Sequence, residues 1–178
     1  MSQTLGVPLK IAAKVDRVDE VYFREQISPL LKGPGVEFIG EIDERQKTDF
    51  LGQALALMFL IDWPEPFGLA MIEAMACGTP VLALRRGSVE EVVEDGLTGH
   101  IVDNIEQAAG AARRVMMLDR RVVRRRFEGR FTAGRMAKDY VQVYNSLSRA
   151  NVRLVSDQAE PLHATAAELA SEPSGSVH

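Results

Sequence analysis

Two glutamates, Glu65 and Glu73, flank a predicted helix start and are the residues of this chain best suited to bind a polar ligand. A carboxylate can accept hydrogen bonds from two vicinal hydroxyls, which is what a ribose or a hexose offers. Phe67, Gly68 and Leu69 lie between them and are predicted to supply the unpaired amides of a first helical turn, which attract anions. The pattern therefore indicates a ligand that carries both a phosphate and a sugar.

The elements around the glutamates support this interpretation. Predicted strands at residues 55–61 and 80–84 precede and follow the motif. Pro66 is expected in the first helical turn, where a missing N–H costs nothing, and this would put Glu65 at the mouth of the helix. Gly68 would let a ligand approach the backbone closely. The alternative is that the acidic residues only cap the helix and bind no ligand.

The rest of the chain alternates short strands with helices. Further strands are predicted at 8–14, 36–39 and 100–102, and helices at 16–31, 43–53, 88–94, 104–118, 120–130 and 132–147. This alternation favours an α/β fold with a Rossmann-like parallel sheet and flanking helices. We expect one nucleotide-sugar-binding domain over residues 1–149 and a disordered tail over 150–178, where the pattern ends.

Two cations follow predicted strands at the edge of the sheet where ligands bind. Lys14 ends the first strand, and Arg86 follows strand 80–84 just before a Gly-Ser pair that opens a helix, with Ser88 as the expected cap. Either cation is a candidate phosphate ligand. The alternative for both is an ordinary solvated side chain.

Composition excludes several classes of function. The formal net charge of −4 argues against a nucleic-acid partner, although eight Arg lie between Arg113 and Arg130; we interpret that run as the solvated face of amphipathic helices. Cys77 is the only cysteine, so no internal disulfide is expected. No apolar run reaches the roughly 20 residues of a membrane span, and no signal peptide is recognisable. We expect a cytoplasmic protein.

The motif Glu65-Pro-Phe-Gly-x-x-x-x-Glu73, continued to Val81, resembles the E-x7-E signature of the group 1 (family 4) glycosyltransferases of the GT-B fold. The segment Val36–Gly40 resembles the family's V-x-F-x-G strand, and Gly87–Gly99 its G-x-x-E-x-V-x-x-D-G-x-T-G stretch. The segment Met136–Leu147 resembles the family's closing helix.

The resemblance implies a retaining transfer of sugar from a nucleotide-sugar donor, with no cofactor and no metal site. By the same resemblance, Glu65 should face the donor sugar, Glu73 should hold the ribose, and Phe67, Gly68 and Leu69 should contact sugar and phosphate. Gly40, Glu41 and Ile42 should lie near the nucleobase.

Two parts of the family pattern have no counterpart in these residues: the acceptor domain and the first βα unit of the donor domain, whose Arg and Lys grip the diphosphate. In a doubly wound sheet of order 3-2-1-4-5-6 that first strand is central. Strands 8–14 and 55–61 must then pair directly, leave their edges open, or recruit another chain.

We therefore expect an N-terminally truncated donor half that is inactive alone. The alternative is a non-catalytic binding module that needs a separate acceptor-domain chain or self-associates through its open sheet edge. A two-component-like receiver domain shares the βα alternation, but no acidic cluster follows the first strand.

Overall fold

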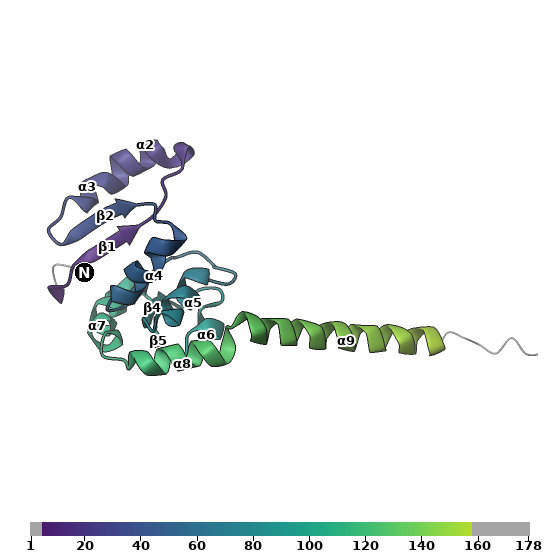
Figure 1. Ribbon diagram of the computed structural model, residues 1–178. Coiled ribbons are helices and arrows are strands. Elements are labelled where there is room, and N and C mark those ends of the chain that lie inside the picture. The colour runs from purple at the N-terminus through teal and green to yellow at the C-terminus, as the bar shows by residue number, and fades with distance from the viewer. Residues whose placement is uncertain (1–4, 158–178) are drawn as a thin grey trace, which may run out of the picture. The chain divides into compact units, whose positions relative to one another are not determined.

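The strands of this chain form two parallel sheets in the computed structural model, which describes residues 5–157 (Figure 1). In the first sheet β1 (Leu9–Ala12) pairs with β2 (Val36–Gly40). The second sheet has the order β3 (Leu57–Phe59), β4 (Val81–Leu84) and β5 (Gly99–Val102). All pairings are parallel and helices flank the strands, so the predicted α/β, Rossmann-like class is confirmed.

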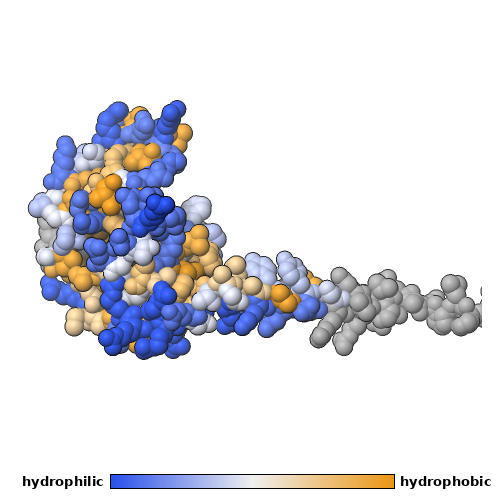
Figure 2. All heavy atoms as spheres, in the orientation of Figure 1, coloured by the Kyte–Doolittle hydropathy of each residue, from blue (hydrophilic) through white to orange (hydrophobic). Residues whose placement is uncertain are grey.

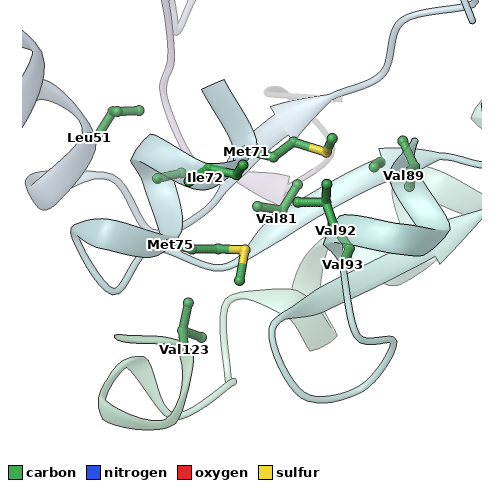
Figure 3. Close-up of a cluster of buried hydrophobic side chains, with 11 residues drawn as sticks. Leu51, Met71, Ile72, Met75, Val81, Val89, Val92, Val93 and Val123 are labelled. Carbon is green, nitrogen blue, oxygen red and sulfur yellow. The ribbon is translucent and has the colours of Figure 1, made fainter. Parts of the chain in front are cut away.

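The hydrophobic core is built around β4, whose four residues are all buried. Because side chains alternate along a strand, Val81 and Ala83 pack into one cluster with α5 (Leu69–Ala76). Figure 3 shows Val81 among Met71, Met75 and the other members of this cluster. Leu82 and Leu84 pack on the other face against α7 (Ile105–Val115). Burial on both faces is typical of a central parallel strand.

Most predicted helices are confirmed, with shifted ends. Helix α4 (Glu44–Gln53) begins at a capping box in which the Asp43 carboxylate accepts the Gln46 amide. Short α6 (Val89–Val92) and the Arg-rich α8 (Arg120–Arg130) also lie where the sequence predicts helices. The surface over α8 is strongly hydrophilic in Figure 2.

The helical segment between β1 and β2 is irregular. It starts as a 3₁₀ turn (η1, Arg17–Asp19), continues as α2 (Glu20–Tyr22) and a π-helical turn (η2, Phe23–Ile27), and ends as α3 (Ser28–Leu31). None of these residues is buried, and Val18 is 87% exposed. A ring contact to the sheet joins Phe23 and Phe38, with centroids 5.0 Å apart. This part of the fold has no core of its own within the described residues.

We therefore predict that residues 9–40 open more easily than the sheet around β4. Hydrogen exchange should be fast in β1 and β2 and slow in β4, because local opening is cheapest where few apolar side chains are buried. Exchange mass spectrometry measures both in one experiment. Equal protection of β2 and β4 would contradict this prediction.

Strands β1 and β3 do not pair with each other, because each ends its own sheet. Direct pairing of these two strands, one of the three arrangements expected from the sequence, is therefore not found among the described residues, and each strand has one edge without a paired strand. An unpaired strand edge presents a row of free N–H and C=O groups, which is a template for another strand.

The second structural unit begins at Ala133 and contains α9 (Ala133–Asp157). This helix passes the expected domain boundary at residue 149, and the rest of the predicted tail, 158–178, lies outside the described residues. Its large apolar side chains within residues 133–148 are more than half exposed, as at Met136, Tyr140 and Leu147. No helix in the described range is long and apolar enough to span a membrane.

Two details of the sequence prediction were wrong. Pro66 is not in the first turn of α5, which begins three residues later at Leu69, because Gly68 has a left-handed backbone (φ 77°) that a right-handed helix cannot include. Ser88 does precede α6, but its side chain makes no capping hydrogen bond.

Candidate functional site

The loop before α5 is held by the carboxylate of Glu65. Its Oε1 accepts hydrogen bonds from the Gly68 amide at 3.1 Å and, more weakly, from the Phe67 amide at 3.5 Å. A carboxylate at unpaired helix-terminal amides is favourable because the bond is charge-assisted and meets the positive end of the helix dipole. Two of the three amides predicted to face a phosphate, those of Phe67 and Gly68, are therefore occupied by the neighbouring glutamate in this structure.

The other predicted residues of this loop keep accessible side chains. Phe67 is 51% exposed and Leu69, the first residue of α5, is 65% exposed. Gly68 itself is buried, and its left-handed backbone turns the chain into the helix. The loop thus presents apolar side chains to solvent beside a carboxylate and a helix N-terminus.

Glu73 lies one turn into α5 and is held by a lysine that the sequence did not single out. Lys47 Nζ of α4 lies 2.8 Å from Glu73 Oε1 and 2.7 Å from Glu44 Oε1. The Glu44 carboxylate, and after it Glu73, raises the pKa of Lys47 above its ordinary value, against a smaller effect of burial. Lys47 therefore stays a cation at neutral pH. Its link to Glu73 could not be predicted because the two residues lie on different helices.

A second loop, between β4 and α6, braces the chain at Glu65. The Ser88 amide donates to the Glu65 carbonyl at 2.9 Å. Gly87 has φ +50°, and a Cβ added there would lie 2.2 Å from the same carbonyl oxygen. Arg86 Nε donates to Asp62 Oδ1 at 2.6 Å, which ties this loop to the segment that follows β3. Arg86, predicted as a phosphate ligand, is thus engaged with a carboxylate of the site's own loop.

The Ser88 hydroxyl is the one buried side-chain polar atom without a hydrogen-bond partner among the residues described. The residue holds its place through its backbone amide and not through its side chain.

The remaining candidates form a group at the ends of β1 and β2. Gly40 ends β2 with φ 76°, and its carbonyl accepts the Ala13 amide at 3.0 Å. Glu41 and Ile42 follow it in the connection to α4, the helix that carries Lys47. Lys14 is exposed and pairs with Asp16 at 2.8 Å. Residues 40–42 and 14 therefore lie together, and α4 leads from them to Glu73.

Within residues 5–157, no three His, Cys, Asp or Glu side chains are grouped so that they could hold a metal ion. The chemistry that this arrangement offers is hydrogen bonding by two carboxylates beside a helix N-terminus. Such a site can orient hydroxyls and an anionic group at the carboxyl ends of parallel strands, the usual ligand position in an open α/β sheet.

The chain belongs to the group 1 glycosyl transferases, because the model of that family matches residues 9–128, which include both glutamates and every braced loop described above. One curated relative, a phosphatidyl-myo-inositol mannosyltransferase of Mycobacterium leprae, is 34% identical over 113 residues. That match covers 64% of this chain but only 30% of the relative.

Solved structures agree on the fold. The sucrose-phosphate synthase of Thermosynechococcus elongatus is 28% identical, with a TM-score of 0.64 over 80% of this chain and 39% of its own. Anabaena HepE, solved in complex with UDP and glucose, has a TM-score of 0.65 at 21% identity and covers 81% of this chain and 43% of its own. The chain therefore spans less than half the length of each of these three proteins.

Proposed function

We propose that this chain is the donor-binding part of a glycosyltransferase that takes a sugar from a nucleotide-sugar with retention at the anomeric carbon. One observation carries the proposal: two carboxylates on one loop–helix segment are held by different partners. Glu65 is held by backbone amides, and Glu73 is held by Lys47. Family membership supports the transferase, and the UDP and glucose bound to Anabaena HepE support the class of donor.

In this proposal each feature contacts a different part of the donor. The Glu73 carboxylate accepts the ribose hydroxyls, and the amides of residues 67–69 meet the diphosphate. Binding of the diphosphate displaces the Glu65 side chain from those amides and leaves it to face the transferred sugar, as the catalytic residue.

Residues further along the site complete the donor contacts. Gly40, Glu41 and Ile42 lie at the nucleobase. Lys14 and Arg86 contribute positive charge near the phosphates, after exchanging their present carboxylate partners, Asp16 and Asp62.

The proposal includes that the 178-residue chain binds a donor weakly and transfers no sugar alone, since it spans only part of each relative. We expect dissociation constants weaker than micromolar for UDP, GDP and ADP, measured by calorimetry or saturation-transfer NMR. The Arg and Lys that grip the diphosphate in the family have no counterpart in these residues, and each charged hydrogen bond lost in this way costs about 1.5–3 kcal/mol of binding free energy. Absence of binding to all three would refute the donor site, and sugar transfer by the purified chain would refute its inactivity.

The second candidate is a binding module that needs a partner chain, and the open edges of β1 and β3 favour it. Either a separate acceptor-domain chain or a second copy would supply a strand to these edges. Sedimentation velocity across a range of concentrations should show self-association. Transfer activity that appears only when a separately expressed acceptor domain is added would select the first of these partners.

A further inference from the structure

We propose that Lys47 is a positioning residue that holds the Glu73 carboxylate in the orientation required to bind the two ribose hydroxyls of a nucleotide. The inference rests on the proposed function, because it concerns the same donor site. It adds a residue to that site which no motif of the sequence marks.

The anchor of Lys47 is rigid. Lys47 lies in the first turns of α4, and the capping box fixes that end of the helix through two reciprocal bonds between Asp43 and Gln46. The following turns of α4 are held by packing, because the buried Leu51 belongs to the core cluster that also contains Ile72 of α5. The two helices that carry Lys47 and Glu73 therefore have a common core.

The contact uses only part of the capacity of the Glu73 carboxylate. Lys47 Nζ lies against Oε1, and a carboxylate has about four acceptor positions, so acceptors remain for two vicinal hydroxyls. The Lys47 side chain is 27% exposed and that of Glu73 is 36% exposed, so the pair lies at the rim of the core and a ligand can reach it.

The ion pair also solves an electrostatic problem of the site. A bare carboxylate would repel the diphosphate of the same ligand, whereas a carboxylate paired with an ammonium group is close to neutral at that distance. Lys47 also pairs with the Glu44 carboxylate at 2.7 Å, but Glu44 is 86% exposed, so solvent screens its charge more than that of Glu73. Glu73 is the better-shielded partner of the two.

Fixing a flexible side chain before binding removes part of the entropy cost of binding. Without Lys47, the Glu73 side chain would rotate freely, and the hydroxyl contacts would have to order it. The loss should fall on recognition of the ribose diol and not on the phosphate or the base. That selectivity separates a positioning role from a merely structural one.

The test compares each nucleoside diphosphate with its 2′-deoxy analogue on the full 178-residue chain, using UDP, GDP and ADP and their deoxy forms in NMR titrations. We expect the wild type to prefer the ribose form of its best ligand by about tenfold or more, tenfold being the low end of the effect of one hydrogen bond to a charged group. Glu73→Gln and Lys47→Met should each bring this ratio close to one. The double variant should lower it no further, since both act on one contact.

Two variants serve as controls. Lys10→Met removes a lysine from an exposed ion pair with Glu37 in the first sheet and should keep the wild-type ratio. Lys47→Arg keeps the charge and should restore most of the preference. Thermal unfolding followed by circular dichroism identifies any variant that fails to fold, and Lys47→Gln, which also removes the charge, then takes the place of Lys47→Met.

The outcomes separate the two proposals. If the wild type binds none of the nucleotides, the proposed function fails, and the role of Lys47 fails with it. If the wild type prefers ribose and Lys47→Met keeps that preference, only the positioning role of Lys47 is overturned. If Glu73→Gln also keeps it, the ribose contact assigned to Glu73 is overturned while donor binding stands.

Discussion

Gly87→Ala should be among the most damaging single substitutions in the candidate site. The added Cβ would lie 2.2 Å from the Glu65 carbonyl oxygen and 2.7 Å from its amide nitrogen, and both are backbone atoms that cannot rotate away. The residue would also have to keep φ near +50°, which disfavours any side chain. Relief of the clash must move the Glu65 loop away from the loop at Ser88. We expect a loss of about 3 kcal/mol in unfolding free energy, the range of overpacking with backbone strain.

A matched control separates the clash from the strain. Gly96 also has positive φ (+75°), but nothing lies within 4 Å of its Cβ position. Gly96→Ala should therefore cost only the left-handed strain, about 1 kcal/mol. Urea unfolding of both variants gives the two free energies. Because only Gly87 touches the Glu65 loop, nucleotide binding should fall for Gly87→Ala alone, and equal effects of the two substitutions would contradict this account.

The sequence predicted the fold well where the pattern was local. The strand predicted at residues 80–84 is confirmed as β4, and its burial on both faces was found only in the structure. Helix α4 was predicted from Asp43 and Glu44, and the capping box explains why. These elements follow from propensity and capping, which depend on neighbouring residues only.

The candidate site was predicted less completely, because the contacts that hold its two glutamates in place join distant parts of the chain. The two glutamates were found from their spacing. Nothing local shows that Lys47 would meet Glu73, or that Gly87 would pack on the Glu65 backbone. The contact of Glu65 with the amides of its own loop depends on the left-handed turn at Gly68, which shortens the predicted helix.

In the Arg-rich helix α8, too, contacts with distant parts of the chain could not be predicted from the sequence. The sequence predicts a solvated face for its arginines, which fits Arg121 and Arg125, both exposed. Arg120, Arg124 and Arg130 instead donate to backbone carbonyls of other elements. A guanidinium carries five donors in a planar fork, so a single arginine can satisfy several orphan carbonyls at once.

Arg120 is the strongest case. Its Nη1 donates to the Ala54 carbonyl, and its Nη2 donates to the carbonyls of Gly52 at 2.7 Å and Cys77 at 3.4 Å and to Thr79 Oγ1 at 2.8 Å. These acceptors lie at the C-terminal ends of α4 and α5, where helices leave carbonyls unpaired. The positive charge also meets the negative ends of both helix dipoles. The fully buried Thr79 completes the network by donating to the Leu51 carbonyl at 2.7 Å.

We expect Arg120→Met to lower the unfolding free energy by about 3–4 kcal/mol, since methionine keeps the aliphatic stem but leaves several part-buried acceptors unsatisfied. Arg121→Met is the matched control, because it removes an exposed arginine from the adjacent position and should change stability by less than about 0.5 kcal/mol.

Thr79→Val should cost about 1–3 kcal/mol alone and much less once Arg120 is gone, since both act in one network. Chemical unfolding of the three single variants and the Arg120–Thr79 double variant measures this coupling. Additive free energies in that cycle would show that the two residues act separately, and a mild Arg120→Met would show that solvent replaces its bonds.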